Sequence, residues 1–187
     1  MTKGFYSIML AQFLSSLADN ALLIAAIALL TTLNEPAWMT PLLKLFFVVS
    51  YVIFAAWVGI FADLMPKGRV MFITNAVKVF GCLLMLFGSH PLLSYAVVGI
   101  GAAAYSPAKY GILTELLPPE KLVIANGWIE GLTVVSIILG VVLGGVLIKP
   151  EVAGYILQTF HLPAIGLDTD PEAGLFIVGI VYALAAA

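Results

Sequence analysis

The chain has 187 residues, of which 63% are hydrophobic and 10% are charged, and its formal net charge is −2. Ordinary globular domains are about 45–50% apolar and about 25% charged, so the composition argues against a soluble domain and indicates an integral membrane protein. The weak negative charge offers no basic surface to nucleic acid. The single cysteine, Cys82, excludes an internal disulfide and a cysteine-based zinc site, and the two histidines lie far apart, so we expect neither a metal nor a cofactor.

Long apolar stretches predict an all-α membrane protein with six helices, because about 20 apolar residues cross a bilayer core of about 30 Å. The predicted ranges are 5–33, 41–61, 70–88, 91–113, 122–148 and 173–187. The last stretch would measure only ~22 Å at 1.5 Å per residue, so we expect the chain to stop inside its sixth helix. The stretches lack the period-two alternation of an outer-membrane barrel, so we expect no strands.

The basic residues orient the predicted bundle. An N-terminus in the cytoplasm would place Lys3, Lys67, Arg69 and Lys121 on the inner side. Most of the acidic loop residues would then lie outside, and an excess of Lys and Arg on the cytoplasmic side favours this orientation. The long segment 149–172 becomes an outer loop, in which the stretch 155–162 has the character to lie along the membrane interface.

The first predicted helix carries a polar face in the membrane. Gln12, Ser15, Ser16 and Asp19 follow each other at i, i+3, i+4 and i+7, and Asn20 lies beside them. A charge at the centre of a membrane helix costs at least ~2.5–3.5 kcal/mol, so we expect Asp19 to have either a function or a compensating interaction. Two interpretations stay open: the face lines a water-filled cavity, or Asp19 is neutral or caps a neighbouring helix.

The third and fifth predicted helices carry similar faces. Their polar residues are Thr74, Asn75 and Lys78 in the third helix, and Asn126, Glu130 and Thr133 in the fifth. Lys78 and Glu130 both come ~12 Å after the predicted start of their helices, so they should share one layer of the bundle. They either form a buried ion pair that fixes the register of the helices or contact a substrate directly.

The fourth predicted helix contains Pro107, which removes one backbone hydrogen bond, and Lys109, about one turn from the predicted cytoplasmic end. Irregular backbone in a membrane is tolerated where it is packed by neighbours or lines a cavity. The Lys109 side chain either extends to the interface or faces inward, where its ammonium group could bind a phosphate.

The turn from Gly59 through Asp63 to Lys67 and Arg69 resembles the signature loop of the major facilitator superfamily. In that loop a glycine stands four residues before an aspartate, and a basic turn follows. Leu64 and Pro66 depart from the pattern, since an arginine and a glycine are usual there. The resemblance implies that the six helices form the N-terminal half of a transporter with two six-helix halves. It also implies that Asp63 caps or pairs at the cytoplasmic helix ends and that the loop acts in gating. The alternative is that Lys67 and Arg69 only fix the topology of the chain.

Three further stretches, 14–23, 101–113 and 125–127, resemble the bacterial lysophospholipid transporters of this superfamily. The resemblance implies that lysophosphatidylethanolamine and lysophosphatidylglycerol move across the inner membrane to its cytoplasmic leaflet. A cytoplasmic acyltransferase, in some members fused to the transporter, then restores the missing acyl chain. On this basis the candidate substrate-binding residues are Asp19, Asn20, Lys78, Tyr105, Lys109 and Glu130.

Two alternatives belong to other classes. A proton-coupled exporter of the same superfamily would usually have an arginine where Tyr95 stands and a proline where Gly145 stands. A membrane-bound acyltransferase would need a histidine followed five positions later by an aspartate, but Tyr95 and Gly166 occupy those positions after His90 and His161. We therefore expect a transporter and not an enzyme.

Overall fold

The computed structural model describes residues 3–186, without the side chains of Lys3, Ala56 and Ile165. Lys3 as an orienting charge and Ala187 as the predicted end of the sixth helix therefore lie outside the described residues. Within this range the chain is helical and contains no strand, which confirms the all-α prediction. The elements are α1 (Lys3–Thr32), α2 (Met39–Leu64), α3 (Lys67–Leu86), α4 (Pro91–Leu116), α5 (Pro119–Leu147), α6 (Pro150–Thr159), the 3₁₀ helix η1 (Leu162–Ile165) and α7 (Asp170–Ala186).

The helices extend further into charged sequence than the apolar stretches do. α2 continues to Leu64 and α3 begins at Lys67, so the turn between them is only two residues long. Long basic side chains can reach the membrane surface from inside a helix, so a helix need not end where the apolar residues end. Prolines open α4 and α5 at positions where their missing N–H group leaves no hydrogen bond unmade.

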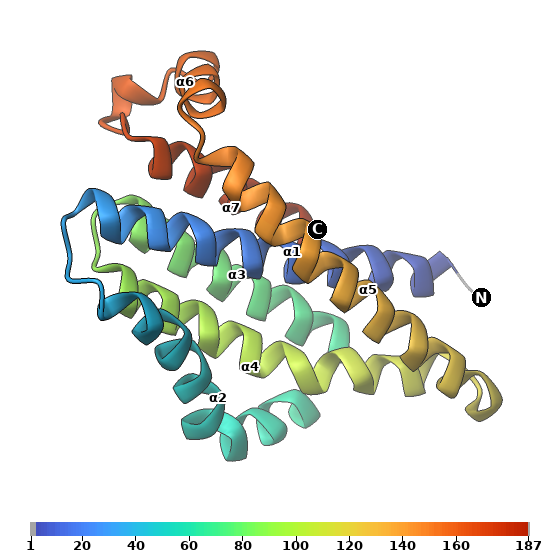
Figure 1. Cartoon of the computed structure of the whole chain (residues 1–187). Coiled ribbons are helices and arrows are strands. Elements are labelled where there is room, and N and C mark those ends of the chain that lie inside the picture. Colours follow the sequence, from blue (N-terminus) through green and yellow to red (C-terminus); the bar gives the residue numbers. More distant parts are fainter. Residues whose placement is uncertain (1–2, 187) are drawn as a thin grey trace.

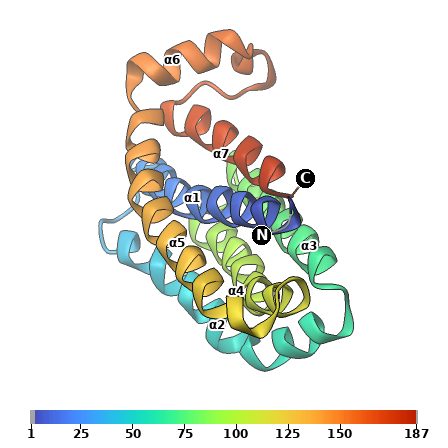
Figure 2. The same ribbon diagram turned by 90° about the vertical axis from the view of Figure 1, so that its right-hand side faces the viewer.

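The six long helices form one bundle in which α4 and α1 are central (Figure 1). α4 packs between α2 and α3, while α1 packs against α5 and α7, and α3 also contacts α7. Viewed from the end, α5 and α2 lie on one side of the bundle and α3 and α7 on the other (Figure 2). α2 is bent by 68° between its segments Met39–Ala55 and Trp57–Leu64.

Glycines allow α5 to approach α1 closely. A Cβ atom added to Gly140 would lie 2.5 Å from the Leu17 carbonyl oxygen, and one added to Gly144 would lie 2.8 Å from that of Ala21. These glycines form the Gly-x-x-x-Gly spacing that is typical of close helix packing in membranes. The contact fixes α5 beside the polar face of α1.

Three helices, α1, α3 and α5, are long and apolar enough to cross a membrane by themselves, and the bent α2 makes a fourth. α7 has 17 residues and begins three residues before the apolar stretch. The Glu172 carboxylate explains this early start, because it accepts the backbone N–H groups of Asp168 and Thr169 at 2.9 and 2.8 Å. This contact is the glutamate half of a capping box, which helps to fix a helix N-terminus; the Thr169 hydroxyl has no hydrogen-bond partner in the described part of the chain.

The outer segment 149–172 is more ordered than the loop that the sequence predicts. It contains α6, whose residues Ala153, Ile156 and Leu157 are buried, followed by η1. Tyr155 lies on the opposite side of α6 and is 72% exposed. The position of the stretch 155–162 along a membrane interface stays a prediction.

Candidate functional site

A polar cavity of about 130 Å³ lies between α1, α2, α3, α4 and α5. The whole predicted polar face of α1 lines it, together with side chains from four other helices. The lining residues are Gln12, Ser15, Ser16, Asp19, Tyr51, Lys78, Ala102, Tyr105, Ser106, Lys109 and Thr133. The spacing of the α1 residues therefore predicted which side of this helix faces the cavity.

The Lys78 ammonium group interacts with a carboxylate, a hydroxyl group and two aromatic rings. Its Nζ atom lies 2.9 Å from Asp19 Oδ2 and donates a second hydrogen bond to Ser15 Oγ, also at 2.9 Å. The same atom lies 5.1 Å from the ring centroid of Tyr105 and 5.7 Å from that of Tyr182. Lys78 is buried, and a buried charge is tolerable only when it is paired and hydrogen-bonded in this way.

The Asp19 carboxylate joins three helices. Its Oδ2 atom contacts Lys78 of α3, and its Oδ1 atom accepts a hydrogen bond of 2.7 Å from the Tyr182 hydroxyl of α7. Both carboxylate oxygens therefore have protein partners. The network continues from Ser15, which donates to Asn75 Oδ1 at 2.8 Å, and Asn75 in turn donates to the Ala185 carbonyl oxygen at 2.9 Å.

The ion pair that we weighed between Lys78 and Glu130 is not the one that forms. Lys78 pairs with Asp19, while exposed Glu130 accepts a hydrogen bond from the Tyr110 hydroxyl. The two residues have similar depths, but α3 packs against α4 and α7 whereas α5 packs against α1. Asn20 donates to the Ser16 carbonyl oxygen at 2.9 Å and lies at the contact between α1 and α5, beside Gly140.

Lys109 differs from Lys78 in that no carboxylate of the described residues lies within ion-pairing distance of its ammonium group, and the carboxylate of Glu130 acts on it only from a longer range. Its side chain lines the polar cavity, its residue is 8% exposed, and its Nζ atom lies 4.6 Å from the ring centroid of Tyr110. Among the residues that the structure describes, no carboxylate or hydrogen-bond acceptor pairs with this Nζ atom. Of the two orientations open for Lys109, the structure therefore has the inward one.

Tyr105 lies one helical turn before Lys109 and faces the same cavity. Its hydroxyl group is buried and has no hydrogen-bond partner within the described part of the chain. A buried polar group without a partner is uncommon in folded proteins. Within the described residues, the α4 wall of the cavity thus carries a lysine without an ion pair and a tyrosine whose buried hydroxyl group has no partner.

The Asp63 loop lies apart from the cavity, at the ends of α2 and α3. Asp63 Oδ1 lies 2.8 Å from Lys67 Nζ, which also donates to the Ala62 carbonyl oxygen at 2.7 Å. The lysine stem packs over Gly111 of α4, where an added Cβ atom would lie 3.0 Å from Lys67 Cε. Arg69 is exposed, and a Cβ atom on Gly59 would meet no heavy atom within 4 Å. The pairing of Asp63 at the helix ends is confirmed, whereas its role in gating stays a prediction.

Comparison with known proteins decides the family. The sequence model of the Major Facilitator Superfamily matches residues 8–187. The chain belongs to this superfamily. It is 51% identical over 146 residues to a protein of Klebsiella pneumoniae named lysophospholipid transporter LplT, a match that covers 78% of this chain and 37% of that protein. It is 52% identical over 182 residues to the protein of the same name from Salmonella heidelberg, covering 97% of this chain and 44% of that protein. The chain therefore spans less than half the length of these curated relatives.

As a member of this superfamily, the chain contributes a helical bundle to a multi-pass membrane protein, as the sequence predicted. The tyrosines around Asp19 were missed, because they lie in continuous apolar stretches and follow no polar spacing. Tyr182 donates to the carboxylate, Tyr95 donates to the Asp19 carbonyl oxygen at 3.4 Å, and Tyr51 lines the cavity. A buried tyrosine hydroxyl usually has a hydrogen-bond partner. The tyrosines within the predicted membrane helices could therefore have been identified as candidate donors to Asp19.

Proposed function

We propose that the chain is the N-terminal half of a lysophospholipid transporter of the bacterial inner membrane. The proposed substrates are lysophosphatidylethanolamine and lysophosphatidylglycerol, which move to the cytoplasmic leaflet for reacylation. The names of the relatives support this substrate class. The observation that carries the proposal is the unpaired Lys109 ammonium group in a cavity whose other lysine is neutralised by Asp19.

The proposed role of Lys109 is to bind the phosphate group of the lysolipid. An ammonium group acts on a phosphate as a point charge, and the interaction gains strength where the surroundings are less polar than water. Tyr105 is one turn away, at ~6 Å along the helix axis, so its free hydroxyl can donate to a second phosphate oxygen. Asp19 and Lys78 hold each other, and we assign them a positioning role instead of direct contact with the headgroup.

The proposed specificity comes from the headgroup and not from the acyl chain. Burying a methylene group out of water is worth about 0.8 kcal/mol, but a lipid in the bilayer has already left the water. Because lipid tails are as apolar as leucine side chains, tails of similar length should be discriminated little. For Asn20 and Glu130, which do not line the cavity, we propose indirect roles, through the contact of α1 with α5 and through Tyr110.

In the proposed orientation the N-terminus and the Asp63 loop lie in the cytoplasm. There Gly59, Asp63, Lys67 and Arg69 would act in gating between two six-helix halves, the second of which supplies the opposite wall of the cavity. The proposed functional partner is a cytoplasmic acyltransferase that reacylates the transported lysolipid. This enzyme is either a separate protein or a further domain fused to the transporter.

The test is uptake of labelled lysophosphatidylethanolamine into spheroplasts by variants of the whole protein. Lys109→Ala should abolish uptake while the protein still inserts, and Lys109→Arg should retain part of it. Lys44→Ala removes an exposed lysine on α2 outside the polar cavity and should transport normally. Normal transport by Lys109→Ala would refute the phosphate role. Export of cationic drugs driven by a proton gradient, without lysolipid transport, would replace this proposal with the exporter alternative.

A further inference from the structure

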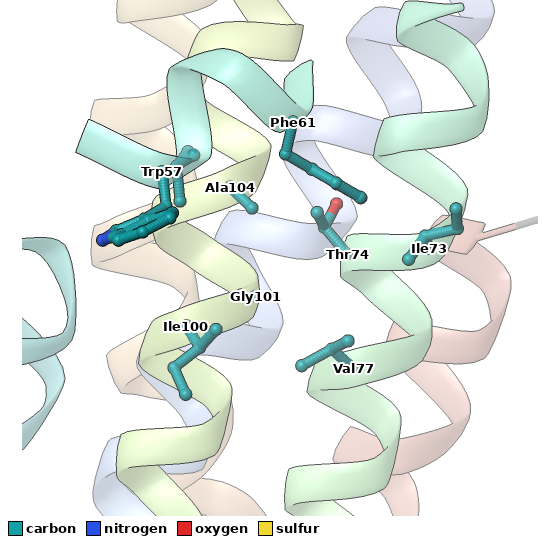
Figure 3. Close-up of a pocket in the computed structure, with 9 residues that line it drawn as sticks. Trp57, Phe61, Ile73, Thr74, Val77, Ile100, Gly101 and Ala104 are labelled. Atoms are coloured by element: carbon teal, nitrogen blue, oxygen red, sulfur yellow. The ribbon is translucent and has the colours of Figure 1, made fainter. Parts of the chain in front are cut away.

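A second cavity lies on the other side of α4 and has a different chemistry. It has a volume of about 220 Å³ and lies between α2 and α3, with α4 as its floor (Figure 3). Its walls are almost entirely apolar and include Trp57, Phe61, Ile73, Val77, Gly101 and Ala104. We call this cavity the α2–α3 slot.

The bend of α2 and the small residues of α4 shape the slot. The segment Trp57–Leu64, which follows the bend, carries Phe61, which extends toward Thr74, and Trp57, whose indole ring lies beside α4 at the edge of the slot (Figure 3). Gly101 lets α4 approach α3 closely, because an added Cβ atom would lie 2.7 Å from the Thr74 carbonyl oxygen, and this contact closes the base of the slot. Ala104 adds only a methyl group one turn further along.

The slot opens on the outer surface of the bundle. Trp57 is 72% exposed and Ile73 is 37% exposed. An apolar cavity of about 150 Å³ stays free of water and binds apolar ligands, and this slot is larger. In the proposed function the second six-helix half covers the polar cavity, so the slot on the other side of α4 faces the acyl chains of the membrane.

One cation lies in line with the slot. Arg69, Ile73 and Val77 are at i, i+4 and i+8 of α3, so Arg69 lies on the slot side of this helix, with its Cα atom ~6 Å along the axis from that of Ile73. The neighbouring Lys67 is neutralised by Asp63. Arg69 is exposed and has no carboxylate partner among the residues described here.

We propose that the α2–α3 slot binds one acyl chain of an anionic bilayer phospholipid whose phosphate group contacts Arg69. This lipid is a bound component of the transporter and not its cargo, because α4 separates the slot from the polar cavity. The apolar walls alone give little preference among lipids, since an acyl chain is in equally apolar surroundings in the slot and in the bilayer. The preference for this site comes from Arg69, at about 1 kcal/mol for one basic residue near anionic lipid, which corresponds to about fivefold.

Tryptophan fluorescence can test this proposal in the whole protein reconstituted in phosphatidylcholine nanodiscs. One variant keeps Trp57 as its single tryptophan, and a second keeps Trp128 of α5, which is 58% exposed and lines an apolar cavity of about 220 Å³ whose lining residues carry no charge. Phosphatidylglycerol with brominated acyl chains is added in increasing mole fraction as the quencher. Trp57 should be quenched with about fivefold preference over brominated phosphatidylcholine, whereas Trp128 should show a preference near one.

Four substitutions test whether the lipid preference belongs to this site. Arg69→Gln should remove it and Arg69→Lys should keep most of it. Ala104→Leu fills the floor of the slot and should reduce the quenching of Trp57, while Ala76→Leu adds the same atoms to the exposed face of α3 outside the slot and should leave it unchanged. Equal preferences for Trp57 and Trp128, or an unchanged preference in Arg69→Gln, would overturn the proposal. Selective quenching by brominated lysophospholipid alone would reassign the slot to the transported substrate.

Discussion

Breaking one partner of the Asp19–Lys78 pair should destabilise the protein more than replacing both partners. Lys78→Met keeps much of the side-chain volume but leaves the Asp19 carboxylate with Tyr182 as its remaining side-chain donor. Removing one member of a buried ion pair costs about 3–5 kcal/mol. The Asp19 side chain is 19% exposed, so water or a proton can replace part of the lost interaction. We therefore expect about 3 kcal/mol for Lys78→Met, the lower end of that range.

Asp19→Asn should be more severe, because the Lys78 side chain is only 2% exposed and water cannot reach it. We expect about 5 kcal/mol, the upper end of the same range. The double variant has no unpaired charge and loses about two hydrogen bonds, at about 0.5–1.5 kcal/mol each. It should therefore be more stable than either single variant.

The assay is reversible unfolding of the whole protein in mixed micelles, followed by tryptophan fluorescence during titration with a denaturing detergent. Asp63→Asn is the matched control, because it breaks an ion pair whose carboxylate side chain is 83% exposed. Exposed pairs of this kind contribute about 0–1 kcal/mol. A double variant as unstable as the sum of the two single variants would refute the reasoning, since the residues would then not be coupled.

Three further predictions follow from single contacts. Gly140→Ala should destabilise the bundle by about 1–3 kcal/mol through overpacking against the Leu17 carbonyl oxygen, whereas Gly145→Ala, with no heavy atom within 4 Å, should be neutral or slightly stabilising in the same unfolding titration. Tyr182→Phe should cost about 1.5–3 kcal/mol, the usual contribution of a hydrogen bond to a charged group, while exposed Tyr155→Phe should have no measurable effect. Asp63→Asn should slow lysolipid uptake and leave the substrate dissociation constant unchanged, if the loop acts in gating. Comparing uptake rates with equilibrium binding checks this point, and an unchanged rate would contradict it.

The sequence predicted depth along each helix but not the lateral order of the helices. The i, i+3, i+4, i+7 spacing on α1 identified a cavity-lining face, because a helix repeats every 3.6 residues whatever surrounds it. Lys78 and Glu130 lie at the same distance from the starts of α3 and α5, which made them candidate partners. Their partners depend instead on packing between α3 and α7 and between α5 and α1, which no local pattern contains. For the same reason the contact of Tyr182 with Asp19, across 163 residues of sequence, could not be predicted.

The different surroundings of Lys78 and Lys109 bear on the kind of solute that the cavity accepts. The lining of the cavity contains one carboxylate and two ammonium groups, so its net charge is +1. Since Asp19 is bound to Lys78 and Tyr182, the excess charge of the lining resides on Lys109, and Glu130 outside the lining offsets it only from beyond ion-pairing distance. A cation entering this space would meet an unpaired ammonium group in surroundings that screen it less than water does. A phosphate would neutralise it and satisfy Tyr105 at the same time. The same feature that favours a phosphate headgroup therefore acts against cationic drugs, and discrimination of this kind rests on repulsion as much as on attraction.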